Sequence, residues 1–247
     1  MRAAEWEFRH RFWVYFAIFG VAFGCYTFDD TNVVAWGVRA VRGTLHDAND
    51  LPIAPLRAIL FVAGGIAVLA AALRTWAAAY LHTEVVHDSA LHADRLVADG
   101  PYRHLRNPLY LGIVLAAVAL AALASRTGAV VLLVVLPWFT LRLIGAEEAA
   151  LAAAGGESYR IYCAVVPRLL PSLRPRLPPG CTLPRWGQAL LGETFFWALA
   201  AAVLAFAATL RIETFYWVLG AAFAFRGVLA MLWWRRKRSR TGRLAST

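Results

Sequence analysis

Six long apolar runs divide the chain, and most of its charged residues lie between them. The runs cover residues 12–28, 56–73, 109–124, 128–141, 194–210 and 215–234. A helix needs about 20 apolar residues to cross a bilayer, and inside lipid a helix satisfies its own backbone hydrogen bonds. We therefore predict an all-α, polytopic membrane helical bundle with about six transmembrane helices. The third and fourth runs are short for a full crossing.

The composition excludes two broad classes of protein. Hydrophobic residues make up 60% of the chain and charged residues 16%, against about 45–50% and 25% in soluble domains. A soluble enzyme and a disordered chain are both excluded on this ground. The net charge of +10 could suggest nucleic acid, but basic residues between apolar runs are typical of topology determinants and headgroup contacts, so we expect no nucleic-acid partner.

The distribution of Lys and Arg predicts the orientation. With a cytoplasmic N-terminus, 18 of the 25 basic residues fall on the cytoplasmic side and 5 on the other, while Arg74 and Arg226 lie within spans. Cytoplasmic loops carry an excess of Lys and Arg. We predict a multi-pass protein with both termini in the cytoplasm. The basic tail, residues 235–247, is expected to be disordered and to meet anionic headgroups.

Features inside the apolar runs have simple interpretations. We expect the glycines of the spans to allow close helix packing and the two arginines to reach the membrane interface. The glycines are Gly20, Gly24, Gly64 and Gly65. Neither an internal repeat nor an inverted pair of broken helices is visible in the sequence, which argues against a transporter.

Two polar segments, 81–107 and 142–187, are predicted to hold any active site. In the first, His82, His87 and His92 recur every fifth residue, so a helix would turn each about 140° from the last, which disfavours a metal cluster. The three cysteines form no CxxC pair, so we expect no metal site.

The first segment ends in the motif GPYRHLRNPLYLG, residues 100–112. Asn107 is predicted to cap a helix that begins at Pro108. Arg103 and Arg106 beside that helix start would form an anion-binding corner. The alternative is that these arginines only set the topology.

The second segment contains RLIGAEEAALAAAGGESYRIYCAVVPRLLP, residues 142–171. The adjacent carboxylates of Glu147 and Glu148 lie at a membrane boundary, where charges need partners. We expect the helix to end at 155–156, at the Gly-Gly pair. A second helix would then present Tyr159 and Tyr162 on one face. The alternative is a solvated juxtamembrane helix followed by an amphipathic one.

Together the two motifs resemble the membrane methyltransferases related to isoprenylcysteine carboxyl methyltransferase and the phospholipid methyltransferases. In that family the first motif reads approximately GPYRxxRHPxYxG. The second is an EE pair followed by FGxxYxxY and a VPR-like end. The resemblance covers residues 96–171. One departure is Asn107, which stands where many relatives have a histidine and cannot titrate; His104 is the nearest imidazole.

The resemblance implies a multi-span methyltransferase that takes S-adenosylmethionine from the cytoplasmic face and a lipophilic acceptor from the bilayer. The implied catalytic residues are Arg106, Asn107, Glu147 and Glu148. The implied cofactor-binding residues are Tyr102, Arg103, Arg106, Asn107, Pro108, Tyr110, Gly112, Glu148, Tyr159 and Tyr162.

The chemistry of the donor fits these residue types. Its carboxylate suits an arginine or a helix N-terminus and its ammonium suits a glutamate. A carboxylate or thiolate acceptor needs no base, whereas an ammonium acceptor would need Glu147 or Glu148 to remove a proton. The acceptor is left open between an isoprenylcysteine carboxylate, a phospholipid amine and another lipophilic molecule.

Two other functions stay open at this point. One is a membrane reductase related to the sterol reductases, which would use NADPH. The other is a non-enzymatic scaffold or transporter. We expect a single membrane domain over residues 1–247, with the methyltransferase motifs in 96–171, a stiff Pro-rich connector, an additional helix pair in 188–234 and the basic tail.

Overall fold

Helices provide the regular secondary structure of this computed structural model, which describes residues 2–43, 52–81 and 98–244. In chain order the elements are α1 (Glu5–Arg9), α2 (Arg11–Gly24), the 3-10 turn η1 (Cys25–Thr27), α3 (Val33–Arg42), α4 (Ile53–Tyr80), the 3-10 turn η2 (Gly100–Arg103), α6 (Pro108–Ala121), α7 (Arg126–Val130), the π-helical turn η3 (Val131–Val135), α8 (Leu136–Val165), α9 (Trp186–Gly192), α10 (Thr194–Thr209) and α11 (Ile212–Leu244). The described residues contain no β-strand, so the predicted all-α class is confirmed.

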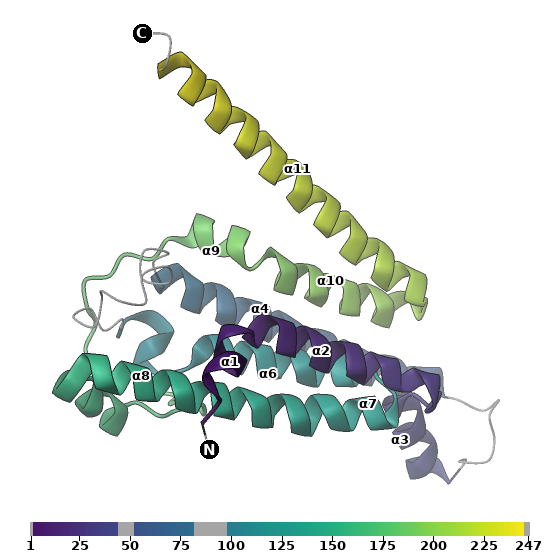
Figure 1. Ribbon diagram of the computed structural model, residues 1–247. Helices are drawn as coiled ribbons and strands as arrows, with labels where there is room; N and C mark the ends of the chain where they lie inside the picture. Colours follow the sequence, from purple (N-terminus) through teal and green to yellow (C-terminus); the bar gives the residue numbers. More distant parts are fainter. Residues whose placement is uncertain (1, 44–51, 82–97, 245–247) are drawn as a thin grey trace.

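Helix α4 lies at the centre of the bundle and packs against both α6 and α10 (Figure 1). Its buried side chains are mostly alanines, such as Ala63, Ala67 and Ala70. At Gly64 a Cβ atom would stand 2.4 Å from the Leu204 side chain of α10. Small residues let helix backbones approach closely where there is no water to drive apolar burial. The predicted close packing is therefore confirmed at Gly64.

The length and apolarity of the described helices support fewer crossings than six. Two continuous helices are long and apolar enough to span a membrane, Ile53–Tyr80 and Arg126–Val165. The pair α9 and α10 would form a third, bent by 60° at the break between them. Two shorter apolar helices, Arg11–Thr27 and Pro108–Ala121, do not reach spanning length. The chain is a membrane protein, and six crossings stays a prediction.

The helix that contains the fourth apolar run ends at the Gly-Gly pair, as predicted. Gly156 has a non-helical backbone, with φ +55° and ψ −134°, and a second helical part follows it to Val165; α8 covers both parts. The π-helical turn η3 precedes Pro137. Proline has no N–H to donate to the preceding turn, and a widened π turn is one way for a helix to accommodate this.

Two other sequence expectations are wrong. Gly20 and Gly24 are exposed, and a Cβ at either would meet nothing within 4 Å. The tail is not disordered throughout, because α11 continues to Leu244. Arg74 lies in a largely buried ion pair described below. His82, His87 and His92 lie outside the described residues.

Ion pairs mark the two ends of the pair formed by α2 and the α7–α8 helix. At one end Arg142 is 2.7 Å from Glu7, and at the other Arg126 is 3.2 Å from Asp29. The two helices therefore run antiparallel (Figure 1). Since Glu148 lies beyond Arg142, the second motif and the N-terminal segment share one end of the bundle.

Candidate functional site

The first motif forms a tight turn before helix α6. Gly100 has φ +57°, and a Cβ there would stand 2.4 Å from the ring of Tyr80. Left-handed backbone and close approach both favour glycine. The 3-10 turn η2 follows, and α6 begins at Pro108 as predicted. Asn107 occupies the N-cap position, but its side chain makes no capping hydrogen bond, so the capping prediction is wrong.

Asn107 instead binds the second motif. Its Nδ2 donates to Glu148 Oε1 at 3.0 Å and to the backbone oxygen of Arg168 at 3.0 Å. The Asn107 side chain thus hydrogen-bonds to groups that are distant in the sequence, and it does not cap the start of α6. Asn107 thereby joins the start of α6 to α8 and to the segment that follows α8.

Glu148 is the centre of this polar cluster. Arg168 Nε is 2.9 Å from its Oε2, and Arg106 Nε is 3.4 Å from its Oε1. The side chain of Glu148 is only 15% exposed. Two guanidinium groups and one amide thus share a single carboxylate, as a largely buried charge requires. The predicted proximity of Arg106 and Glu148 is confirmed.

The Pro-rich segment after α8 runs beside the first motif. The N–H of Arg106 donates to Pro167 O, and the N–H of Ser172 donates to His104 O, both at 2.9 Å. Arg103 uses its side chain here, since Nε donates to Leu177 O at 2.8 Å. Backbone pairing therefore fixes the position of Arg168, which follows Pro167 directly.

Asp99 anchors the far part of the same segment. Its carboxylate accepts the N–H groups of Gly180 and Thr182. Burial alone would raise the pKa of Asp99, but these hydrogen bonds and the nearby Arg103 outweigh burial and hold the pKa below its ordinary value. Asp99 is therefore ionised at neutral pH and ties the connector to the first motif.

The two tyrosines of the second motif follow the bend at Gly156. Tyr162 donates its hydroxyl to the backbone oxygen of Tyr102 at 2.9 Å. Tyr159 packs beside Tyr162, with ring centroids 5.9 Å apart. Burial raises the pKa of the Tyr102 hydroxyl above its ordinary value, so this tyrosine stays neutral. The tyrosines thus join the two motifs a second time.

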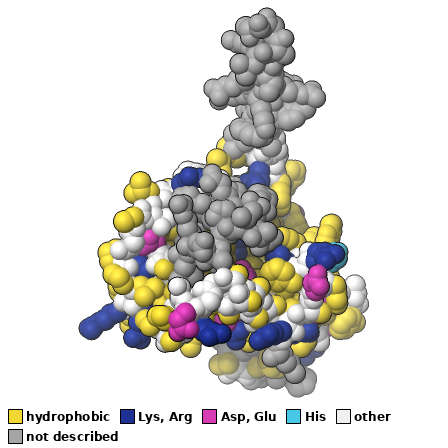
Figure 2. Space-filling view, turned by 60° about the vertical axis from the view of Figure 1, so that its left-hand side comes forward, with side chains coloured by type: hydrophobic (Ala, Val, Ile, Leu, Met, Phe, Trp, Pro, Cys, Tyr) yellow, Lys and Arg dark blue, Asp and Glu magenta, His cyan; other side chains and the backbone are white. Residues whose placement is uncertain are grey.

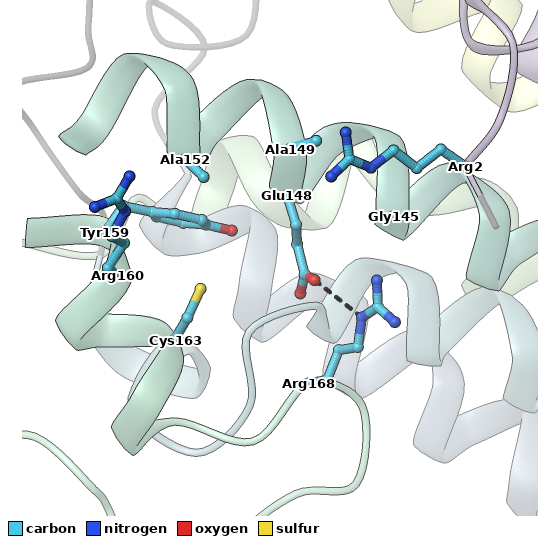
Figure 3. A pocket seen from close by; sticks show the side chains of 9 residues that line it. All are labelled: Arg2, Gly145, Glu148, Ala149, Ala152, Tyr159, Arg160, Cys163 and Arg168. Carbon is cyan, nitrogen blue, oxygen red and sulfur yellow. Dashed lines mark ion pairs between the residues drawn. The ribbon is translucent and has the colours of Figure 1, made fainter. Parts of the chain in front are cut away.

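A pocket of about 380 Å³ opens beside Glu148, between α8 and its continuation after the bend. It is lined by Arg2, Gly145, Glu148, Ala149, Ala152, Tyr159, Arg160, Cys163 and Arg168 (Figure 3). Gly145, Ala149 and Ala152 present small side chains, which leave the space open. Arginine and glutamate side chains provide the polar contacts, and Tyr159 provides an aromatic wall.

Only part of the predicted site lines this pocket. Glu148 and Tyr159 do, while Arg106 and Asn107 contact Glu148. The other predicted residues lie outside the pocket. Tyr102, Arg103 and Tyr162 connect chain segments through hydrogen bonds, and Pro108 is buried at the start of α6. Gly112 packs on Arg74, and the half-buried Glu147 interacts with Tyr110. Their roles toward a ligand stay predictions.

Several lining residues escaped the sequence analysis. Arg168 lies in the VPR-like end of the second motif, and its charge next to the rigid Pro167 is the signal that could have predicted it. Arg2, Arg160 and Cys163 carry no comparable local signal, because their position depends on the bend and on distant packing.

A second buried ion pair joins α4 to the break between α9 and α10. Arg74 of α4 meets Glu193 in the break between α9 and α10, with Nε–Oε2 at 2.6 Å and Nη2–Oε1 at 3.0 Å. Arg74 also donates to Leu109 O at 3.0 Å and stacks on the ring of Phe196. Gly112 of α6 leaves room for its aliphatic stem. This pair locks three helices together.

The surface of the molecule agrees with a lipid environment. Large apolar side chains such as Phe12, Trp13 and Phe16 are mostly exposed. In Figure 2, dark-blue basic and magenta acidic side chains interrupt the yellow apolar surface of one face. An exposed apolar belt of this kind is expected of helices that face lipid.

Comparison with known proteins supports the resemblance seen in the motifs. Residues 59–153 match the isoprenylcysteine carboxyl methyltransferase (ICMT) family. No curated protein and no solved structure matches the chain. The chain is thus a membrane protein whose residues 59–153 are similar to a family of methyltransferases.

The match and the motifs overlap without coinciding. The matched residues begin in α4, upstream of the first motif, and end before Gly156. They include Arg106, Asn107 and Glu148. The N-terminal segment, Tyr159, Arg168 and the last helix pair lie outside the match.

Proposed function

We propose that the chain transfers a methyl group from S-adenosylmethionine to a lipophilic acceptor in the membrane. The observation that carries this proposal is the meeting of the two motifs at Glu148, beside a polar pocket, in a chain whose residues 59–153 match a methyltransferase family. The family match gives no support to the reductase or to a scaffold.

The residues present suit the proposed donor. The pocket volume of about 380 Å³ falls within the range of about 300–1,000 Å³ typical of small-molecule sites. Arginines suit the donor's carboxylate, and Glu148 suits its ammonium or ribose hydroxyls. Tyr159 offers an aromatic face to a purine ring or a sulfonium.

When bound, the donor supplies an electrophilic methyl group on a sulfonium. The protein's part in an in-line displacement is to position the reactants and to exclude water. Arg106, Asn107 and Arg168 hold the Glu148 carboxylate in one orientation, which preorganises it for a ligand. Asn107 holds a carboxylate and needs no titrating proton for this role.

The need for a base depends on the acceptor. A carboxylate acceptor arrives ionised, so no side chain has to remove a proton. An ammonium acceptor would have to lose one, and Glu147 beside Tyr110 is then the candidate. Among the described residues, the only carboxylate that lines the pocket is Glu148, which is already paired, so we favour an acceptor of the isoprenylcysteine carboxylate type.

The membrane arrangement belongs to the same proposal. We place the pocket and both termini on the cytoplasmic side on the basis of the basic residues, which implies an even number of crossings. The joint position of the N-terminal segment and the second motif at one end of the bundle supports this placement. The acceptor would enter laterally from the bilayer.

The test combines binding with transfer. Purified protein in detergent should bind S-adenosylhomocysteine by calorimetry, and membranes that contain the chain should move labelled methyl groups to a lipid-soluble product. Glu148→Gln should weaken both. Glu213→Gln, a change at an exposed residue of α11 that does not line the pocket, should weaken neither. Absence of binding to the wild type, or competition by NADPH, would overturn the proposal.

A further inference from the structure

The N-terminal segment is fastened to helix α8 next to the pocket. The N–H of Ala3 donates to Arg142 O at 3.0 Å, and Arg142 Nη2 donates to Glu7 Oε2 at 2.7 Å. The same Glu7 oxygen accepts the N–H of Ala4 at 2.6 Å. Arg142 also lies over the ring of Trp138. Glu7 thus connects the first turn of the chain to α8 at one point.

This attachment brings Arg2 to the pocket. Arg2 precedes Ala3 directly, and its side chain reaches toward Gly145 and Ala149 on α8 (Figure 3). The backbone oxygen of Arg2 accepts from Arg142 Nη2 at 3.5 Å. The guanidinium therefore lies on the pocket wall formed by one face of α8.

Arg2 differs from the other arginines that line the pocket in having no carboxylate partner among the described residues. Arg168 pairs with Glu148, and Arg160 lies 3.7 Å from Glu157. Within residues 2–43, 52–81 and 98–244, Arg2 has no carboxylate within 4.0 Å. A cation on a pocket wall without an internal counterion is suited to an anionic group of a ligand.

We propose that the N-terminal segment is part of the donor site and that Arg2 binds the carboxylate at the amino-acid end of the donor. This inference rests on the function proposed above. A guanidinium can hold a carboxylate through two parallel hydrogen bonds, which fixes orientation as well as position. The segment lies outside the matched residues 59–153, so the family match does not supply this contact.

The experiment measures whether Arg2 and the ligand carboxylate depend on each other. Two ligands are compared by calorimetry: S-adenosylhomocysteine, and 5′-methylthioadenosine, which lacks the amino-acid end. Arg2→Ala should lower the affinity for S-adenosylhomocysteine on the order of tenfold, as expected for the loss of one charged hydrogen-bonded contact. The same change should leave the affinity for 5′-methylthioadenosine unaltered.

Matched variants separate this role from a structural one. Arg9→Ala removes another arginine of the same segment, which is exposed and pairs only with Glu5 among the described residues, and should alter neither affinity. Glu7→Gln weakens the attachment to Arg142 and should reduce S-adenosylhomocysteine binding less than Arg2→Ala. Arg2→Lys should restore part of the affinity.

Each outcome decides a different statement. Equal S-adenosylhomocysteine affinity in the wild type and Arg2→Ala would overturn the role of Arg2 while leaving the proposed function intact. Equal weakening of both ligands would show that Arg2 only supports the fold of the site, which also overturns the inference. A wild type that binds neither ligand would overturn the proposed function and this inference together.

Discussion

Two arginine–glutamate clusters in this chain use the same chemistry in different surroundings. Glu193 and Arg74 form a two-point ion pair, closed in by Phe196 and by the backbone of α6. Glu148 accepts a hydrogen bond from Asn107, forms ion pairs with Arg106 and Arg168, and lines an open pocket. Side-chain exposure hardly differs, at 10% for Glu193 and 15% for Glu148. Open space beside the carboxylate therefore distinguishes a candidate site from a structural ion pair.

The largest expected effect is on stability, at the closed pair. Arg74→Ala would leave Glu193 buried without its partner, and breaking a buried pair in this way costs about 3–5 kcal/mol. Thermal unfolding in detergent should show a large fall in the midpoint. The double variant Arg74→Met with Glu193→Leu should recover much of the loss, since an apolar pair of similar volume avoids the unpaired charge.

Unchanged stability of Arg74→Ala would mean that water or lipid headgroups reach Glu193. In that case the contrast between a closed and an open cluster would not hold.

At the open cluster the main effect should fall on ligand binding. Glu148→Gln keeps the shape but removes the charge that Arg106 and Arg168 share. We expect S-adenosylhomocysteine affinity to fall at least about tenfold, with a stability loss of about 1 kcal/mol, because water in the pocket can solvate Arg168 and the amide oxygen of the new glutamine can still accept from Asn107. Glu148→Gln should therefore reduce binding more than stability, whereas Arg74→Ala should reduce stability more than binding. A variant that unfolds before it loses ligand would contradict this.

Whether the sequence predicts each cluster depends on how far apart in the chain its contacting residues lie. The motifs place Arg106 and Glu148 together because the family resemblance supplies the long-range pairing. No local pattern pairs Arg74 with Glu193, 119 residues away, so Arg74 was expected at the membrane interface. The position of Arg2 cannot be predicted from the sequence either, because it depends on the contact between Glu7 and Arg142.

At Asn107 a local prediction fails, because contacts with distant residues replace the expected helix cap. The Asn-Pro pair correctly marks where α6 begins, because proline fits the first helical position. The amide nevertheless donates to Glu148 and Arg168, which gives a buried carboxylate a partner that water cannot provide. Helix positions were thus predictable from periodicity, while side-chain roles at the helix ends required the tertiary structure.

A smaller effect is expected at the bend that shapes the pocket. Gly156 has φ +55° and ψ −134°, and a Cβ there would meet no atom within 4 Å. Gly156→Ala should therefore cost only backbone strain, about 1–3 kcal/mol. It should also weaken ligand binding, because Tyr159 follows the bend. Calorimetry and thermal unfolding measure the two effects.

Gly65→Ala is the matched control for this substitution. Gly65 lies within α4, and a Cβ there also meets nothing within 4 Å. This change should be neutral or slightly stabilising, since alanine is the better helix former. A cost at Gly156 no larger than at Gly65 would show that the bend is not maintained by glycine.

The smallest expected effect is a pH dependence of the connector. The pKa of Asp99 is lowered in the folded protein by hydrogen bonds from Gly180 and Thr182. A lowered folded-state pKa gives stability that is present above the unfolded pKa of about 4 and is lost as the pH falls through the folded value. Proteolysis of the segment 171–185 should therefore accelerate below about pH 4. Asp99→Asn should show fast cleavage already at neutral pH and a weaker pH dependence.

The central claim is that the two motifs enclose the methyl donor beside Glu148. An experimental structure determined with S-adenosylhomocysteine tests this claim most directly. The account predicts ligand density between Glu148 and Tyr159, with the carboxylate of the ligand at Arg2. Ordered ligand density elsewhere in the bundle, with the space beside Glu148 filled by protein or water, would contradict it.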